Sequence, residues 1–571
     1  MPKATPRNLD QEALRCKEVW VKPVGAQKGS ERFPRPLKAG DRSFKPLYKP
    51  WRLNLTALSH VYNLYFLAEG HLILVYQPNY PEQTLPKVPL LRILLPKSPD
   101  WLLQYDDGRD FINHLVVTFL GNIEVLIVTC DNGDVMALYT HCIQHEMVRD
   151  MSRRNRSAWL KPFFCRNVGM SAWGIAVHTR ARKIAVSSNT THVTVFSLGL
   201  SLKEHSPSDF KLLLVDRPRD EIVRLGRVGD NIPAIAFCNT PDDPYGQYLM
   251  AGDILGRFFM WDLHSGSGTP VDHKYVWFCP DQVCDCPVLS HSVWSIAFLD
   301  PRAFIPTPGF HPPRGVDWNA SVFRHFVPDS STSHKITKSS HGLYPGTNRY
   351  SLNPDQVKEY SEWRGSSRNP FTFSASHLWE HSREFVTHKK LHVGCVRPIG
   401  SHPTQPPRVP IFVSSDGDTF LLQSPSQLRA NTSPIVQYHN PLAQVEYLPP
   451  DDDYPDGEPT LNAHMQRLPF QACISELGIL LVGNPSGRVG LWALGKAEDG
   501  TFFKRLDWIL PLKSQEEAGQ RPEAWMVGMA VGPLQGSLQE EWDGRSPRRW
   551  RVIMEYSDGG WLAYEIGRKL E

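Results

Sequence analysis

The chain has 571 residues, of which 41% are apolar, and a formal net charge of +3. A chain of this length and apolar content can bury a large core or several smaller ones, which excludes an intrinsically disordered protein. Its 49 proline and 40 glycine residues predict short elements with many turns and long irregular connections, as in an all-β protein rather than a helical one.

The basic surplus lies at the N-terminus. Residues 1–52 contain 13 Lys and Arg against 5 Asp and Glu, a charge of +8, which leaves −5 for the remainder (3 − 8 = −5). We interpret this segment as a basic, flexible N-terminal arm that is mainly solvated. If the protein contacts nucleic acid, we expect it to do so only through this arm.

Nothing in the sequence predicts a secretory signal or a membrane span, because no continuous run of about 18 apolar residues occurs. The ten cysteines stand mostly alone in apolar stretches, which favours reduced core thiols over a disulfide framework. We therefore expect an intracellular protein, nuclear or cytoplasmic or both, with no membrane association.

A turn residue followed by an apolar or aromatic strand recurs seven times along the chain. The copies are 70–76, 132–139, 191–198, 256–263, 416–423, 487–494 and 559–566. Six have a preceding strand, at 124–130, 183–188, 247–252, 409–415, 478–483 and 549–556. A further strand lies upstream in five of them, at 112–120, 172–178, 232–237, 470–475 and 525–531. One unit therefore has at least three strands joined by Asn, Asp and Gly turns.

These units predict an all-β, seven-bladed WD40-like β-propeller. The strands are apolar at successive positions, as expected where both faces of a sheet are covered, and the intervals between them are too broken by Pro and Gly for the helices of an α/β fold. The spacing of equivalent positions exceeds that of a compact blade, so we expect long inter-strand loops. Because no blade can bury its own faces, the first blade must meet the last.

One interval is much longer than the others, because Trp261 and Leu422 are 161 residues apart. We place blades 1–4 and the start of blade 5 in residues 53–299, with 290–299 as the opening strand of blade 5. Residues 300–408, rich in Pro, Ser and His, form a large irregular insertion with a short helix expected near 374–391. The rest of blade 5 and blades 6 and 7 occupy 409–571.

Two clusters of residues resemble zinc-binding motifs. His377, Glu380 and His381 match the H-x-x-E-H order of a zinc-dependent hydrolase, but they lie in the Pro-rich insertion and no third-ligand helix follows. The cluster of Cys279, Cys284, Cys286 and His291 lacks the spacing of a zinc knuckle. We expect no catalytic, cofactor-binding or metal-binding residues; a zinc hydrolase is the least favoured alternative.

Four long blocks of the sequence resemble a known family. They are residues 58–86, 112–135, 167–196 and 289–298, and they look like the fungal WD-repeat proteins that regulate constitutive transcription of ribonucleotide reductase. The resemblance covers residues 51–300 well and the C-terminal blades more loosely. It implies a noncatalytic scaffold that restrains ribonucleotide-reductase gene expression in the DNA-damage and replication response. An alternative implication is a substrate receptor or adaptor of a cullin-type ubiquitin ligase.

Partners would then be proteins of the transcription machinery or of a ubiquitin ligase, bound by propeller loops and by the 300–408 insertion. The sequence does not define which residues bind them, nor the oligomeric state. The chain also departs from usual WD repeats: one blade ends in Trp-Asp, and Ala251 stands where Ser is common. We therefore expect most of the repeats' polar network to be absent, and Trp261 to be a packing position.

Overall fold

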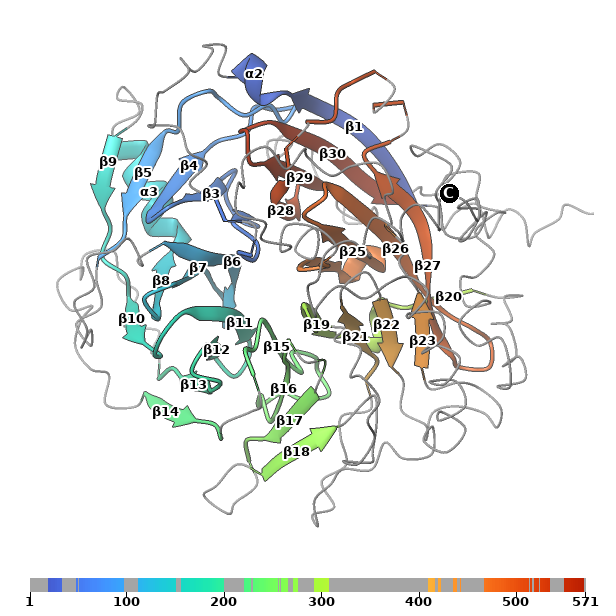
Figure 1. The fold of residues 1–571 in the computed structure, drawn as a ribbon. Coiled ribbons are helices and arrows are strands. Elements are labelled where there is room, and N and C mark those ends of the chain that lie inside the picture. The colour runs from blue at the N-terminus through green and yellow to red at the C-terminus, as the bar shows by residue number, and fades with distance from the viewer. Residues whose placement is uncertain are drawn as a thin grey trace, which may run out of the picture.

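A computed structural model describes residues 19–32, 48–49, 51–96, 111–149, 156–199, 220–226, 230–264 (except 255 and 257), 271–275, 292–307, 409–415, 419–422, 435–438, 442, 467–534 (except 513, 516, 517 and 523) and 549–568. Its strands form seven sheets arranged around a central axis (Figure 1). Neighbouring strands are antiparallel except in two pairs, β5 (Leu91–Leu94) with β9 (Arg156–Trp159) and β20 (Ile305–Pro306) with β26 (Arg488–Lys496). The fold is a seven-bladed β-propeller, so the predicted fold class is confirmed.

Blades 1 to 3 follow one another along the chain. Blade 1 contains β2 (Thr56–Leu58), β3 (Tyr65–Glu69), β4 (Leu72–Tyr76), β5 (Leu91–Leu94) and, outermost, β9 (Arg156–Trp159). Blade 2 contains β6 (Ile112–Leu120), β7 (Ile123–Cys130), β8 (Asp134–Tyr139) and β10 (Phe164–Asn167). Blade 3 contains β11 (Ala172–His178), β12 (Lys183–Ser188), β13 (Val193–Ser197) and β14 (Glu221–Arg224).

Blade 5 is split by the long interval seen in the sequence. Blade 4 contains β15 (Ala234–Phe237), β16 (Tyr248–Gly252), β17 (Phe258–Asp262) and β18 (Val271–Tyr275). Blade 5 begins with β19 (Ser295–Phe298) and resumes with β21 (Ile411–Ser414), β22 (Thr419–Leu422) and β23 (Ile435–Tyr438). Ser295 pairs with Ser414, so β19 is the first strand of blade 5 although more than 100 residues separate it from β21.

Blades 6 and 7 complete the ring. Blade 6 contains β24 (Phe470–Ile474), β25 (Ile479–Asn484), β26 (Arg488–Lys496) and β27 (Phe502–Leu510), with the short β20 (Ile305–Pro306) parallel to the end of β26. Blade 7 contains β28 (Met526–Pro533), β29 (Trp550–Tyr556), β30 (Trp561–Arg568) and β1 (Val19–Gln27). All seven repeated segments found in the sequence are third strands of their blades.

The outermost strand of blade 7 comes from the N-terminus. β1 pairs antiparallel with β30 from Val19 opposite Arg568 to Gln27 opposite Trp561, so the two ends of the chain close the ring (Figure 1). The prediction of a flexible arm is therefore wrong for residues 19–27. The charge of this segment did not predict a strand, because its alternation of apolar and polar residues is weak and its partner strand lies more than 500 residues away in the sequence.

The insertion also begins as part of the ring. After β19 a short 3-10 helix, η3 (Pro301–Ala303), leads into β20, and the buried side chain of Phe304 packs in the core of blades 5 and 6. The predicted boundary at residue 300 is thus too early by several residues. Residues 374–391, with their expected helix, lie outside the described residues.

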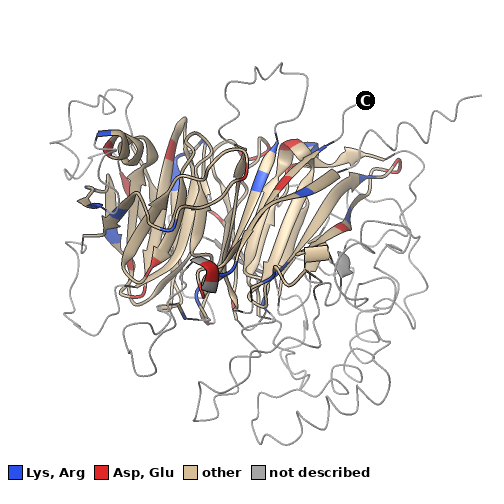
Figure 2. Cartoon of the chain, turned by 90° about the horizontal axis from the view of Figure 1, so that it is seen from above, with Lys and Arg blue, Asp and Glu red and all other residues tan. Residues whose placement is uncertain are grey.

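Helices are few among the described residues, as predicted: α2 (Gly29–Arg32) and α3 (Thr140–Arg149), with the 3-10 helices η3 and η8 (Ser475–Leu477). None of the helices that the structure describes is both long and apolar enough to cross a membrane. Seen edge-on, the blades are mostly uncharged along their length, and charged residues gather near the strand ends (Figure 2).

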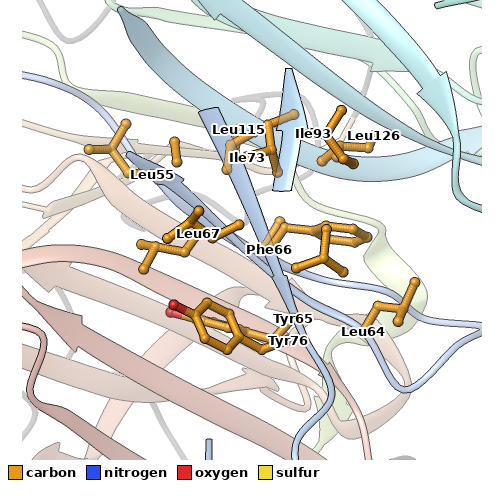
Figure 3. Packing of buried hydrophobic residues seen from close by; sticks show 14 of the residues in the cluster. Leu55, Leu64, Tyr65, Phe66, Leu67, Ile73, Tyr76, Ile93, Leu115 and Leu126 are labelled. Atoms are coloured by element: carbon orange, nitrogen blue, oxygen red, sulfur yellow. The ribbon is translucent and has the colours of Figure 1, made fainter. Parts of the chain in front are cut away.

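The cores lie between the blades. Phe66 and Ile73 of blade 1 are fully buried and belong to the same core cluster as Leu126 of blade 2, whereas the equally buried Tyr65 lies beside Tyr76 (Figure 3). Trp261, the Trp-Asp tryptophan, is also fully buried, among residues of blades 3 and 4. The sequence prediction that it is a packing position is confirmed.

Candidate interaction face

One face of the ring carries the between-blade connections and the turns joining second to third strands; we call it the connection face. Near blades 1 to 3 it includes residues 48–55, 70–71, 111, 131–133, 168–171 and 189–192. Hydrogen bonds between these segments, such as Ile112 N to Gly70 O at 2.8 Å and Ser171 N to Asp131 O at 2.8 Å, hold them together.

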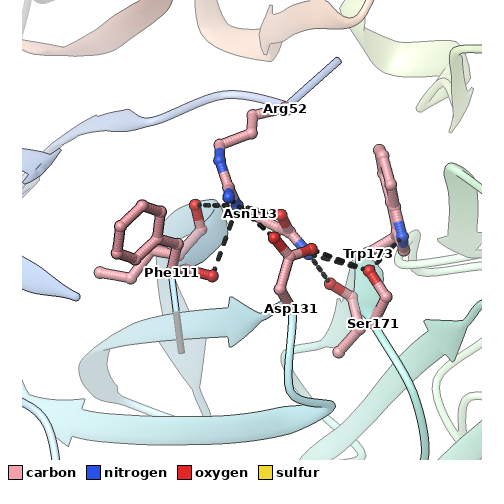
Figure 4. Close-up of polar contacts among 8 residues, drawn as sticks. Arg52, Phe111, Asn113, Asp131, Ser171 and Trp173 are labelled. Atoms are coloured by element: carbon pink, nitrogen blue, oxygen red, sulfur yellow. Dashed lines mark hydrogen bonds and ion pairs between the residues drawn. The ribbon is translucent and has the colours of Figure 1, made fainter. Parts of the chain in front are cut away.

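A polar network joins three blades at this face (Figure 4). Arg52, which precedes β2, donates to the carboxylate of Asp131 at 2.7 Å and to the carbonyl oxygen of Ile112 at 2.9 Å. The amide of Asn113 donates to Asp131 at 2.8 Å and to the carbonyl oxygen of Ala172 at 2.9 Å. The network therefore runs from blade 1 through blade 2 to blade 3.

Ser171 and Trp173 complete the network on blade 3. The Ser171 hydroxyl donates to Asp131 Oδ1 at 2.9 Å and accepts from the Trp173 indole N–H at 2.9 Å. Ser171 has a φ of +52°, an unusual conformation for a residue other than glycine, and its bonds to Asp131 hold it there. Arg52 is buried, and its ion pair with the partly exposed Asp131 offsets part of the cost of removing the guanidinium from water.

Next to this fixed network, apolar and basic side chains reach the surface. Met170, one residue before Ser171, is 59% exposed although its carbonyl oxygen accepts from Asn189 N at 3.0 Å. Lys49 lies over the ring of the half-buried Trp51, with Nζ 5.5 Å from its centroid. An exposed methionine on a backbone that cannot shift easily is suited to contact with another protein.

A second set of contacts repeats around the ring. Near the end of the second strand, one residue in six of the blades faces the next blade; we call it the junction position. It is Thr129, Ser187, Gly252, Ser414, Gly483 and Glu555, in blades 2 to 7.

Three junction positions carry hydroxyls that donate to a backbone carbonyl of the following blade. Thr129 donates to Trp173 O at 3.1 Å, Ser187 to Ile232 O at 2.6 Å and Ser414 to Leu468 O at 2.7 Å. The expectation that the polar network of the repeats is mostly absent is therefore wrong for these junctions. The comparison with Ala251 was also one residue out of register, since Gly252 holds the junction position of blade 4.

Blade 7 uses a buried carboxylate at the same position. Glu555 is fully buried and accepts from the Tyr65 hydroxyl of blade 1 at 3.0 Å. Nearby, Arg551 is also fully buried and donates to the amide oxygens of Asn63 and Gln83 in blade 1. Burial lowers the pKa of Arg551 to about 9. The seam at which the ring closes is thus more polar than the core between blades 6 and 7.

The described titratable groups include two cysteines whose pKa is raised by burial. Burial raises the pKa of the Cys238 thiol to about 12 and that of Cys142 to about 11, which makes both poor nucleophiles. Within the described part of the chain, no three His, Cys, Asp or Glu side chains are placed to hold a metal ion. His377, Glu380 and His381, and the cluster from Cys279 to His291, lie outside the described residues.

The polar network of this face could not be predicted from the sequence alone. Arg52 and Asp131 are 79 positions apart, and neither belongs to a recognisable motif. The available signal was the Asp-Asn-Gly turn at 131–133, which predicts a hairpin but says nothing of what its carboxylate binds.

The chain was compared with known protein families, proteins and structures. No protein-family model matches the sequence. A WD40 repeat-containing protein of Dictyostelium discoideum is 26% identical over 214 residues, which is 38% of this chain and 25% of that protein. The chain thus matches about a quarter of that relative's length. A chain in a crystal structure of the mitotic checkpoint complex has a TM-score of 0.41 and 9% identity, over 96% of this chain and 95% of that one.

The chain therefore has the seven-bladed propeller fold, and over 214 residues it is similar to a WD40 repeat-containing protein.

Proposed function

We propose that the protein is a noncatalytic interaction scaffold that binds a protein partner on the connection face of blades 1 to 3. The observation that carries the proposal is the three-blade network from Arg52 to Trp173, beside which Met170 is exposed. WD40 propellers such as the similar Dictyostelium protein suggest the same general role.

A preformed surface favours binding because little conformational freedom is lost on association. Here the hydrogen bonds of Ser171 and Asn189 fix the backbone on both sides of Met170. Binding therefore costs mainly the ordering of a few side chains, of which methionine adapts easily to a partner's shape.

Affinity purification with mass spectrometry tests this role. Full-length wild-type protein should retain specific partners that are lost with Met170→Glu, because a carboxylate would be buried at the contact. The matched control is Val148→Glu, since Val148 on α3 is 56% exposed but lies away from the face. Recovery of the same partners by Met170→Glu and the wild type would overturn the proposed face.

For the cellular role, we propose regulation of ribonucleotide-reductase transcription in the DNA-damage and replication response. The support is the resemblance of residues 58–86, 112–135, 167–196 and 289–298 to fungal regulators of that transcription. Much of these blocks forms the inner strands of blades 1 to 3 and the start of blade 5. Loss of the gene should raise ribonucleotide-reductase transcripts in unstressed cells, and unchanged transcripts would contradict this role.

The alternative is a substrate receptor or adaptor of a cullin-type ubiquitin ligase. The same purification separates the two: chromatin or transcription components support the regulator, and cullin subunits support the receptor. Neither outcome depends on Met170, so the cellular role and the binding face can fail independently.

A further inference from the structure

Ser157 lies on β9, the outermost strand of blade 1. β9 pairs in parallel with β5, and among the described strands it has no neighbour on its other side. Ala158 points inward and is buried, whereas Ser157 and Trp159 point outward and are exposed, Trp159 by 70%. The Ser157 hydroxyl is therefore open to solvent on an extended edge strand.

The residues before Ser157 are strongly basic. The sequence is Arg153-Arg154-Asn155-Arg156-Ser157, with arginines one, three and four positions ahead of the hydroxyl. Protein kinases select their substrates partly by charge complementarity, and acidic kinase grooves pair with arginines on the N-terminal side of the acceptor. An extended, exposed serine with this charge pattern suits a basophilic serine/threonine kinase.

Only a short stretch would need to leave the sheet for a kinase to bind. β9 has four residues, and such an edge strand opens locally at much lower free energy than a central strand. The Arg156 guanidinium, on the inward side, holds this end of β9 through Glu146 of α3, with 2.5 Å between Nη2 and Oε1. The outward face of the strand does not depend on that ion pair.

We propose that Ser157 is a phosphorylation site for a basophilic serine/threonine kinase, and that the phosphate is then held by Arg92. In the transfer, the bond between the γ-phosphorus of ATP and its bridging oxygen breaks and a bond to Ser157 Oγ forms. ADP leaves, and the hydroxyl proton passes to the kinase's catalytic carboxylate.

Arg92 is placed to receive the phosphate. It is the register partner of Ser157 on β5, and partners on neighbouring parallel strands point to the same face. The strands are about 4.8 Å apart, within the reach of an arginine side chain. A phosphoserine carries about −1.5 to −2 charges and three acceptor oxygens, so it forms strong charge-assisted hydrogen bonds with a guanidinium. Phosphorylation should therefore tighten β9 against blade 1.

The first test treats the folded, full-length protein with the catalytic subunit of cAMP-dependent protein kinase and labelled ATP. Incorporation should map to Ser157 by tandem mass spectrometry, fall at least tenfold in Ser157→Ala, and persist in Ser157→Thr. Ser152→Ala, in the same basic run, is the matched control and should leave the labelling of Ser157 unchanged. Labelling of a 151–160 peptide but not of Ser157 in the folded chain would overturn the site.

The second test measures hydrogen exchange of residues 156–159 before and after phosphorylation. We expect exchange to slow about fivefold in the wild type, consistent with a partly exposed ion pair, and not to slow in Arg92→Gln. Equal slowing in both proteins would show that Arg92 does not hold the phosphate. Both readouts are independent of the proposed partner face.

Discussion

The junctions on either side of blade 4 meet the same structural requirement with different chemistry. At the junction of blades 3 and 4, the Ser187 hydroxyl donates to Ile232 O and accepts from Gly174 N at 2.8 Å. At the junction of blades 4 and 5, Gly252 has no side chain, and the side chain of Val293 packs against its Cα. A Cβ at residue 252 would lie 2.4 Å from Val293 Cγ1.

The difference shows that the junction position is limited by space rather than by residue type. Where the next blade offers a carbonyl oxygen, a small hydroxyl bridges the two blades. Where it offers an aliphatic side chain, only glycine fits. A search for a repeated Ser therefore misses four of these six junctions, although the backbone register is the same in all of them.

The largest effect should come from opening the ring. Truncation after residue 524 removes β28, β29 and β30, so blade 1 loses its neighbour and β1 loses its partner. We expect insoluble or protease-labile protein, measured by limited proteolysis and thermal unfolding. Removal of residues 569–571 alone, which follow β30, is the control and should leave the melting transition unchanged. A sharp, unshifted transition in the long truncation would contradict closure.

Gly252→Ser tests the glycine junction directly. The added side chain would collide with Val293, so we expect the free energy of unfolding to fall by about 2–3 kcal/mol, the range found for overpacked cores. Denaturant unfolding measures the loss. Adding Val293→Ala should recover part of it, and a double variant no better than the sum of the two single changes would refute steric coupling.

Acid should weaken the junction of blades 2 and 3 through His114. Its Nδ1 donates to Trp173 O at 3.3 Å, the same oxygen that Thr129 bonds, and burial lowers its pKa from 6.5 to about 4. The unfolded chain therefore takes up the proton first, and stability is lost as the pH falls from 6.5 to 4, by about 2–3 kcal/mol.

The check is the pH dependence of thermal unfolding in His114→Gln. This variant should lose less stability than the wild type between pH 6.5 and 4. Substitution of the exposed His71 by Gln is the control and should leave the wild-type pH profile in place. Parallel profiles for His114→Gln and the wild type would rule out this contribution.

Ser187→Ala should have the smallest effect. It removes the hydrogen bond to Ile232 O and leaves Gly174 N without its acceptor, at a cost of about 1–2 kcal/mol. Ser187→Thr keeps the hydroxyl and tests space instead of bonding. If Ser187→Ala had the same denaturation midpoint as the wild type, the Ser187 hydroxyl would not stabilise this junction.

The sequence predicted local features of the fold well. Runs such as 124–130 and 487–494 identified second and third strands, since their apolar pattern and turn residues depend only on neighbours in the chain. Fourth strands and cross-blade pairings were not predicted. β9 and β20 each join a sheet built from a different part of the chain, and nothing in their four and two residues specifies that partner.

The candidate site was predicted less well for a related reason. The bond between Arg52 and Asp131 depends on where two blades meet, and a carboxylate in an Asp-Asn-Gly turn looks the same whether or not an arginine is beside it. His377, Glu380 and His381 show the limit of a short motif in another way: they lie outside the described residues, and their spacing alone does not establish a metal site.

The pairing of β1 with β30 also delays completion of blade 7 during protein synthesis. Val19–Gln27 leaves the ribosome more than 500 residues before its partner strand, Trp561–Arg568. At about 5–20 residues per second, the first strand waits roughly half a minute to two minutes for its partner. Until then the nascent chain has exposed sheet edges, so only a chain translated past Arg568 can cover them, and a chain interrupted earlier stays exposed to chaperones and proteases.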